Sequence, residues 1–186
     1  MKKSNFLKAS IFIFTLFIGQ TYFAQKTKMV GGAEMFPSKN IVENAVNSKD
    51  HTTLVAAVKA ADLVETLSGD GPFTVFAPIN KAFEMLPEGT VASLLKPENK
   101  EQLQTILTYH VVSGKVSAAD LIKMIEDNDG KVDIETVSGG TITAWMKNKK
   151  VYISDENGGK AEVTIADVNQ SNGVIHVINS VLLPKS

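Results

Sequence analysis

Hydrophobic positions recur with two different periods along this chain. From about residue 40 to 98 they return every three or four residues, as in Leu54, Val55 and Val58, a spacing typical of amphipathic helices. From residue 131 to 184 the period is mostly two, which is typical of strands with one buried face. Helices followed by strands in one chain predict an α+β fold.

Residues 73–83 contain a predicted strand that passes directly into a short helix. In an extended strand, Val75 and Ala77 point to one face, and Thr74 and Phe76 point to the other. Pro78 lacks the N–H that a sheet requires, so the strand should end there. Asn80 is a favourable residue for the N-cap of the helix that follows.

The N-terminal region predicts three successive segments. Residues 1–24 have three lysines (Lys2, Lys3 and Lys8), then an apolar run and a small residue at Ala24, which together predict a signal peptide. A retained membrane anchor is the alternative, but the apolar run is shorter than the roughly 20 residues that span a bilayer. Residues 25–38 predict a flexible leader, and residues 39–185 predict the folded domain.

Composition excludes several classes of function. The 19 basic residues are all lysines, and loss of residues 1–24 leaves 16 of them against 20 acidic residues, a net charge of −4. Nucleic-acid binding is not expected, because it calls for a basic surface and favours arginine. No cysteine occurs, which excludes disulfides and thiolate metal sites. We also find no phosphate loop, no nucleophile motif and no His-Glu-x-x-His pair, so we expect neither an enzyme nor a cofactor.

Three segments together resemble the fasciclin domain family. Residues 74–83 are similar to its first signature, with Ile79 in place of the usual Thr, and residues 172–184 are similar to its second. Between them, Tyr109-His110 resembles the central Tyr-His element of the family. The resemblance implies a β-wedge or sandwich with a helical layer packed on it. We expect the two signatures to lie side by side as neighbouring strands.

The resemblance also implies candidate contact residues. Asp167 and Val168 match an Asp-centred element implicated in receptor binding in animal members, although Ala166 replaces the Pro that usually precedes the Asp. Tyr109 and His110 match the Tyr-His element implicated in adhesion. Each has a structural alternative. The Asp167 carboxylate could cap the turn at residues 169–173. The helical spacing favours His110 as a buried histidine bonded to backbone.

The leading hypothesis is an extracytoplasmic adhesion module. The resemblance implies contact with an extracellular protein or a polysaccharide, and we expect a secreted, periplasmic or cell-surface protein without membrane insertion after signal cleavage. We expect a monomer or a weak homo-oligomer. The alternative is a secreted carrier that binds a small molecule or lipid in a crevice between helices and sheet. Trp145, Met146 and Tyr152 are candidates for such a site, although we favour core positions for them.

Overall fold

The predicted strand at Phe73 lies between two neighbours, second from one edge, in a seven-stranded sheet whose order is β4-β3-β9-β8-β7-β6-β5. The computed structural model describes residues 27–185. The strands are β1 (Lys28–Val30), β2 (Ala33–Met35), β3 (Phe73–Pro78), β4 (Val111–Ser113), β5 (Lys131–Glu135), β6 (Thr141–Lys147), β7 (Lys150–Ser154), β8 (Lys160–Gln170) and β9 (Gly173–Ile178). The helices are α1 (Ile41–Ala45), α2 (Thr52–Ala60), α3 (Val64–Ser68), α4 (Asn80–Glu84), α5 (Thr90–Leu94), α6 (Lys100–Tyr109) and α7 (Ala118–Asp127), with 3₁₀ turns η1 (Lys49–His51) and η2 (Pro97–Asn99).

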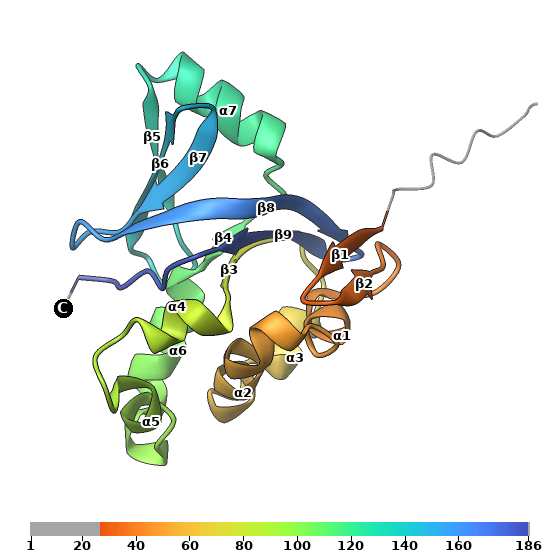
Figure 1. Cartoon of the computed structure of the whole chain (residues 1–186), viewed down its shortest axis with the longest axis vertical. Helices are drawn as coiled ribbons and strands as arrows, with labels where there is room; N and C mark the ends of the chain where they lie inside the picture. Colours follow the sequence, from red (N-terminus) through yellow and green to blue (C-terminus); the bar gives the residue numbers. More distant parts are fainter. Residues whose placement is uncertain (1–26, 186) are drawn as a thin grey trace, which may run out of the picture.

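Strands β3 and β9 carry the two sequence signatures and pair in parallel, with Phe76 opposite His176. The expectation that these segments are neighbouring strands is confirmed. β4 pairs antiparallel with β3 on one side, and the long β8 pairs antiparallel with β9 on the other. β8 then joins the β5–β7 meander, so the sheet forms the two arms of a wedge (Figure 1).

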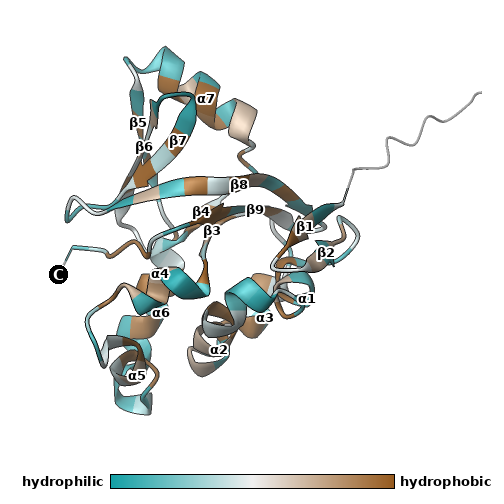
Figure 2. Ribbon diagram, in the orientation of Figure 1, coloured by the Kyte–Doolittle hydropathy of each residue, from teal (hydrophilic) through white to brown (hydrophobic). Residues whose placement is uncertain are grey.

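Two apolar cores occupy opposite faces of the paired signatures. Val75 and Ala77 of β3 belong to the core shared with helices α1, α2 and α6, whereas Phe76 belongs to the core that α7 covers. Figure 2 shows hydrophobic positions concentrated along β3 and β9, as expected of strands covered on both faces. The predicted α+β fold, with a helical layer on a wedge-shaped sheet, is therefore confirmed.

The close approach of β9 to β3 depends on residues at the turn before β9. The Asn172 side chain accepts a hydrogen bond from the Ile41 N–H at 3.0 Å and donates to the carbonyls of Leu67 and Gly69, both at 2.9 Å. A Cβ on Gly173 would lie 2.1 Å from the carbonyl oxygen of Phe73. One amide thus ties α1 and α3 to the turn, and glycine is required beside it.

The segment expected to be a flexible leader contains structure. β1 and β2 form an antiparallel hairpin around Gly31 and Gly32, which both have positive φ. Val30 and Met35 are only 4% and 2% exposed and belong to the core under the helices. The expectation of a flexible leader is therefore wrong for residues 28–35, because two apolar side chains fix the hairpin on the domain. The predicted signal peptide lies outside the described residues.

Asn80 has a different role from the predicted one. It is the first residue of α4, and Ile79 occupies the N-cap. Its side-chain oxygen instead accepts hydrogen bonds from the N–H of Thr53 at 3.0 Å and the hydroxyl of Thr52 at 3.2 Å, and its amide donates to the Lys49 carbonyl. Asn80 therefore caps the neighbouring helix α2 from a distance.

Candidate interaction site

Tyr109 ends α6 with its side chain wholly buried. Its hydroxyl donates a hydrogen bond to the Thr141 carbonyl at 2.6 Å and accepts one from the Glu156 N–H at 3.2 Å. Burial raises the pKa of Tyr109 to about 12. A Cβ on Gly140 would lie 2.7 Å from the ring, so the tyrosine packs directly on the backbone. This side chain links α6 to the β6 arm.

His110 is the C-cap of α6 and is 3% exposed. Its Nδ1–H donates to the Ile106 carbonyl at 2.8 Å, and its Nε2 accepts from the Leu182 N–H at 3.0 Å. These two bonds fix one neutral tautomer. Burial lowers the pKa of His110 to about 4. The hypothesis of a buried histidine bonded to backbone is confirmed.

Asp167 lies in an irregular part of β8, where the register with β9 shifts between Ile165 and Val168. Its φ is +52°, a conformation that side-chain-bearing residues rarely adopt. The carboxylate accepts a hydrogen bond from the Ala118 N–H at 2.7 Å, at the start of α7. The suggested cap on the turn at 169–173 is therefore wrong, because the carboxylate serves the first turn of a distant helix.

The residues around Asp167 are held by a second buried histidine. The Asp167 N–H donates to His176 Nδ1 at 3.3 Å, and His176 Nε2–H donates to the Val116 carbonyl at 2.9 Å. Burial lowers the pKa of His176 as well. Val168 is 1% exposed, so Asp167 is the half-buried member of the four candidate contact residues, while Tyr109, His110 and Val168 are buried.

The two candidate pairs are held by different elements. Tyr109 and His110 lie where α6 joins β4, whereas Asp167 and Val168 lie in β8 beside the start of α7. A role of these four residues in partner binding stays a prediction.

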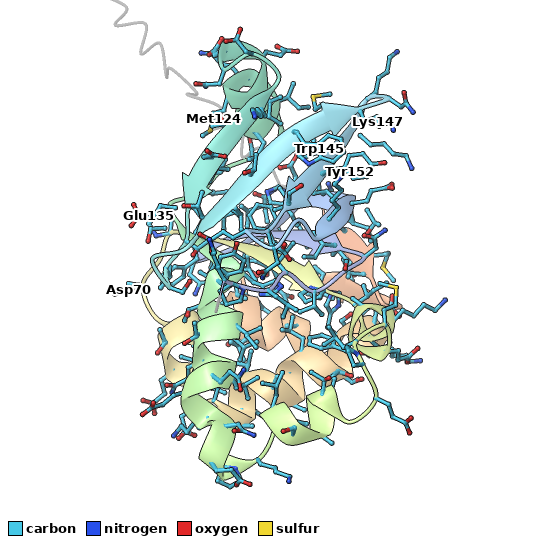
Figure 3. The ribbon with its side chains drawn as sticks, turned by 90° about the vertical axis from the view of Figure 1, so that its left-hand side faces the viewer. Asp70, Met124, Glu135, Trp145, Lys147 and Tyr152 are labelled. Carbon is cyan, nitrogen blue, oxygen red and sulfur yellow. The ribbon has the colours of Figure 1, made fainter. Side chains whose placement is uncertain are left out.

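A separate aromatic surface lies on the outer face of β6, β7 and β8. Trp145 and Tyr152 are cross-strand partners whose rings stack with centroids 4.8 Å apart, and Figure 3 shows them side by side on this face. Trp145 Nε1–H donates to the Ser154 hydroxyl at 2.8 Å, and the Lys160 ammonium lies 5.6 Å from the Trp145 ring centre. Both rings are half-buried, so the core positions favoured for them are wrong. We call Trp145, Tyr152 and Lys160 the aromatic face.

Met146 points to the opposite side of β6 and packs against the core beneath α7. Its expected core position is confirmed. His51, which the sequence pattern did not single out, is buried under the helices with its ring hydrogen-bonded to the Ser48 hydroxyl and to the Ala77 backbone. Only its position at the start of an apolar helical pattern could have drawn attention to it.

Within residues 27–185, no cluster of three or more His, Asp or Glu side chains has a geometry suited to a metal ion. In the same part of the chain, none of the helices combines the length and apolarity required to cross a bilayer.

Comparisons with known proteins agree with this architecture. The chain matches the family described as Fasciclin domain over residues 49–184. Protein sll1483 of Synechocystis sp. is 51% identical over 160 residues, which are 86% of this chain and 82% of that protein. The transforming growth factor-beta-induced protein ig-h3 of Sus scrofa is 35% identical over 153 residues, which are 80% of this chain and 20% of that protein.

A solved structure has the same fold. A FAS1 domain pair from the insect cell adhesion molecule Fasciclin I aligns with a TM-score of 0.69 and 21% identity, over 78% of this chain and 51% of that one. At that identity the likeness concerns the fold alone.

Proposed function

Since this chain belongs to the fasciclin domain family, we propose that it is an extracytoplasmic adhesion module that contacts a protein or a polysaccharide through exposed side chains. The proposal includes export by the predicted signal peptide and no catalytic step. The Fasciclin I domain pair, described as part of a cell adhesion molecule, supports it by its shared fold.

The observation that carries the proposal is the aromatic face. Tyr and Trp are enriched where proteins bind partners, because each ring offers a large apolar surface together with a polar group. Trp145 and Tyr152 stand together on a solvent-facing side of the sheet, with Lys160 beside them. Both rings are pre-positioned by cross-strand pairing and by the Trp145–Ser154 hydrogen bond, which reduces the entropy lost on binding.

We propose a more limited role for the residues implied by the family resemblance. Asp167 is the half-buried residue of the four, so we assign a direct contact to it. Tyr109, His110 and Val168 are buried, and we propose that they affect binding by fixing the backbone around the exposed residues. Substitutions of the three buried residues should therefore lower stability and affinity together.

The test is a pull-down with the signal-cleaved protein from its own cell envelope and medium, followed by direct binding measurements on the captured protein or polysaccharide. Trp145→Ala should weaken binding at least about tenfold, the range of an interface hot spot. Asp167→Ala should weaken it less and should cost about 1 kcal/mol of stability through loss of the Ala118 hydrogen bond.

Met85→Ala is the matched control, because Met85 is an exposed apolar residue, 65% accessible, next to α4. It should leave binding unchanged. Equal binding by wild type and Trp145→Ala, with both folded by circular dichroism, would overturn the assignment of the aromatic face. Failure to capture any specific partner with the wild type would count against adhesion itself.

A further inference from the structure

Lysine side chains surround the aromatic face on the outer side of the β5–β8 meander. Residues directly opposite each other in paired antiparallel strands share a face of the sheet. Lys131 of β5 is opposite Trp145, and Lys147 of β6 is opposite Lys150 of β7. The Lys160 ammonium of β8 lies 5.6 Å from the Trp145 ring centre. Figure 3 shows Lys147 on the same side of the sheet as Trp145, so four strands bring lysines to one surface.

Three of these lysines have no carboxylate partner. Lys150 forms an ion pair with Glu162, with its Nζ 2.6 Å from a carboxylate oxygen. No ion pair in the described part of the chain involves Lys131, Lys147 or Lys160, and all three residues are exposed. Single unpaired lysines are common on protein surfaces, but three of them beside one aromatic pair concentrate positive charge at that place.

The remaining acidic residues on this side of β5 lie further from the tryptophan. Asp133 is opposite Thr143, whose hydroxyl donates to the Asp133 carboxylate at 2.6 Å. Glu135 is opposite Thr141, at the other end of β6 from the lysines. Negative charge therefore gathers at one end of the β5–β6 pair and positive charge at the end that carries Trp145. This positive surface belongs to a chain whose net charge without residues 1–24 is −4, so it favours an anionic partner locally.

The distribution of the lysines indicates a partner with repeated charges. Four adjacent strands span about 14 Å across a sheet, which is too far for one small anion to meet every lysine. A lysine ammonium is a compact, strongly hydrated point charge without the planar fork of arginine, and the chain contains no arginine. Each contact with a carboxylate should therefore be weak, and binding should depend on several of them together.

The rings distinguish between kinds of polyanion. Part of Trp145 and Tyr152 remains accessible on this surface, since both residues are half-buried. An aromatic ring offers an apolar surface on which the C–H face of a sugar ring can pack, while polar groups at its edge remain free for hydroxyls. A polysaccharide with carboxylates on its sugar rings supplies both the charges and the flat apolar faces. An acidic polypeptide supplies the charges alone.

We propose that the surface formed by the aromatic face together with Lys131 and Lys147 binds a carboxylated polysaccharide. Sugar rings pack on Trp145 and Tyr152, and their carboxylates lie near the ammonium groups of the three unpaired lysines. This inference rests on the proposed adhesion function and specifies the chemical class of its partner.

The probe is sodium polygalacturonate, in which every sugar carries a carboxylate. Two matched probes separate its features: fully methyl-esterified polygalacturonate keeps the rings and removes the charge, and poly-glutamate keeps the charge and removes the rings. Calorimetric titration of the signal-cleaved protein should show saturable binding of polygalacturonate, at least about tenfold tighter than that of either matched probe. Raising the salt from 50 to 200 mM should weaken it on the order of tenfold, as expected when about three counterions are released.

The emission of Trp145 reports where the polymer binds, because the chain contains one tryptophan. Polygalacturonate should shift this emission and protect it from quenching by iodide, with the same midpoint as the calorimetric titration. Binding without any change in Trp145 emission or quenching would place the polymer elsewhere and would overturn the proposal.

The decisive variant replaces Lys131, Lys147 and Lys160 together by glutamine. These side chains are exposed, so the fold should persist, and binding of polygalacturonate should weaken at least about tenfold with a smaller dependence on salt. The matched control replaces three exposed lysines of the helical layer by glutamine and changes the net charge equally; these are Lys59, Lys81 and Lys96. It should bind as wild type.

Equal loss of affinity in the two triple variants would mean that net charge alone attracts the polymer, and would overturn the proposal. So would equal binding of poly-glutamate and polygalacturonate by the wild type, or no binding of polygalacturonate. The adhesion function can survive each of these results: if the pull-down captures a partner whose binding Trp145→Ala weakens, adhesion stands and only the carboxylated polysaccharide is excluded.

Discussion

Acidification should destabilise this domain mainly through histidines that the fold keeps neutral. His110 is the clearest case, because its Nδ1–H donates to the Ile106 carbonyl and its Nε2 accepts from the Leu182 N–H. A second proton would have to be placed on Nε2, where it would face the Leu182 N–H in a site that is 3% exposed. The native state therefore binds this proton far less readily than the unfolded chain does.

The magnitude follows from the pKa. Burial lowers the pKa of His110 from 6.5 to about 4, which corresponds to about 3 kcal/mol at about 1.4 kcal/mol per pKa unit. The unfolded chain takes up the proton as the pH falls through 6.5, so stability begins to decline there. By pH 4.5 about 2.5 kcal/mol should be lost through His110, and the loss should level off below pH 4. Burial also lowers the pKa values of His51 and His176, so both act in the same direction.

Urea denaturation between pH 7 and 4.5, followed by the fluorescence of Trp145, measures this effect. The matched variant is His110→Asn, whose amide can still donate to Ile106 but does not titrate. It should be less stable than wild type at pH 7, by about 1–3 kcal/mol, because the buried Leu182 N–H loses its acceptor. Its stability should then fall with pH less steeply, and the two proteins should converge near pH 4.5. Parallel stability curves would refute the reasoning.

Two further substitutions test how the helical layer is held on the sheet. Asn172→Ala removes three hydrogen bonds, to the backbone of Ile41, Leu67 and Gly69. It should lower the free energy of unfolding, measured by urea denaturation, by about 3 kcal/mol. A decrease below about 1 kcal/mol would contradict the role of Asn172 in holding the helices on the sheet. Met35→Ala should cost about 2–4 kcal/mol because the side chain is 2% exposed in the core, whereas a neutral result would mean that the hairpin is dispensable.

The parts of the fold that local pattern specifies could be predicted. The alternation in residues 73–78 assigned Val75 and Ala77 to one face and Phe76 to the other, and the two cores take them up in that way. The helical spacing placed His110 on the inward face, where it is found. These outcomes depend on short-range periodicity, which the sequence displays directly.

The errors arose where a side chain serves a distant segment. Asn80 has the right residue type and position for an N-cap, but its amide is used by α2, 27 residues earlier. The carboxylate of Asp167 accepts a hydrogen bond from the Ala118 N–H, 49 residues away. Its position depends on a register shift in β8 that no local sequence pattern predicts. The hairpin at residues 28–35 was missed because its strands have three residues each, too few for a period of two to be recognised.

The same long-range hydrogen bonds indicate which residues could determine the choice of binding partner. Asn80, Asn172 and the two histidines His110 and His176 use their polar atoms on backbone groups of other elements, and three of these residues lie in the two signature segments. A side chain that satisfies a buried backbone group cannot be exchanged without leaving that group unpaired, so its identity follows from the fold. Trp145 and Tyr152 satisfy no buried backbone group with their polar atoms. The Trp145 N–H donates to the Ser154 hydroxyl and the Tyr152 hydroxyl donates to the Glu162 carboxylate, both on the same outer face. If the signatures preserve the wedge and the outer face meets the partner, grafting the Trp145–Tyr152 pair onto another domain of this fold should transfer binding, whereas grafting the signatures should not.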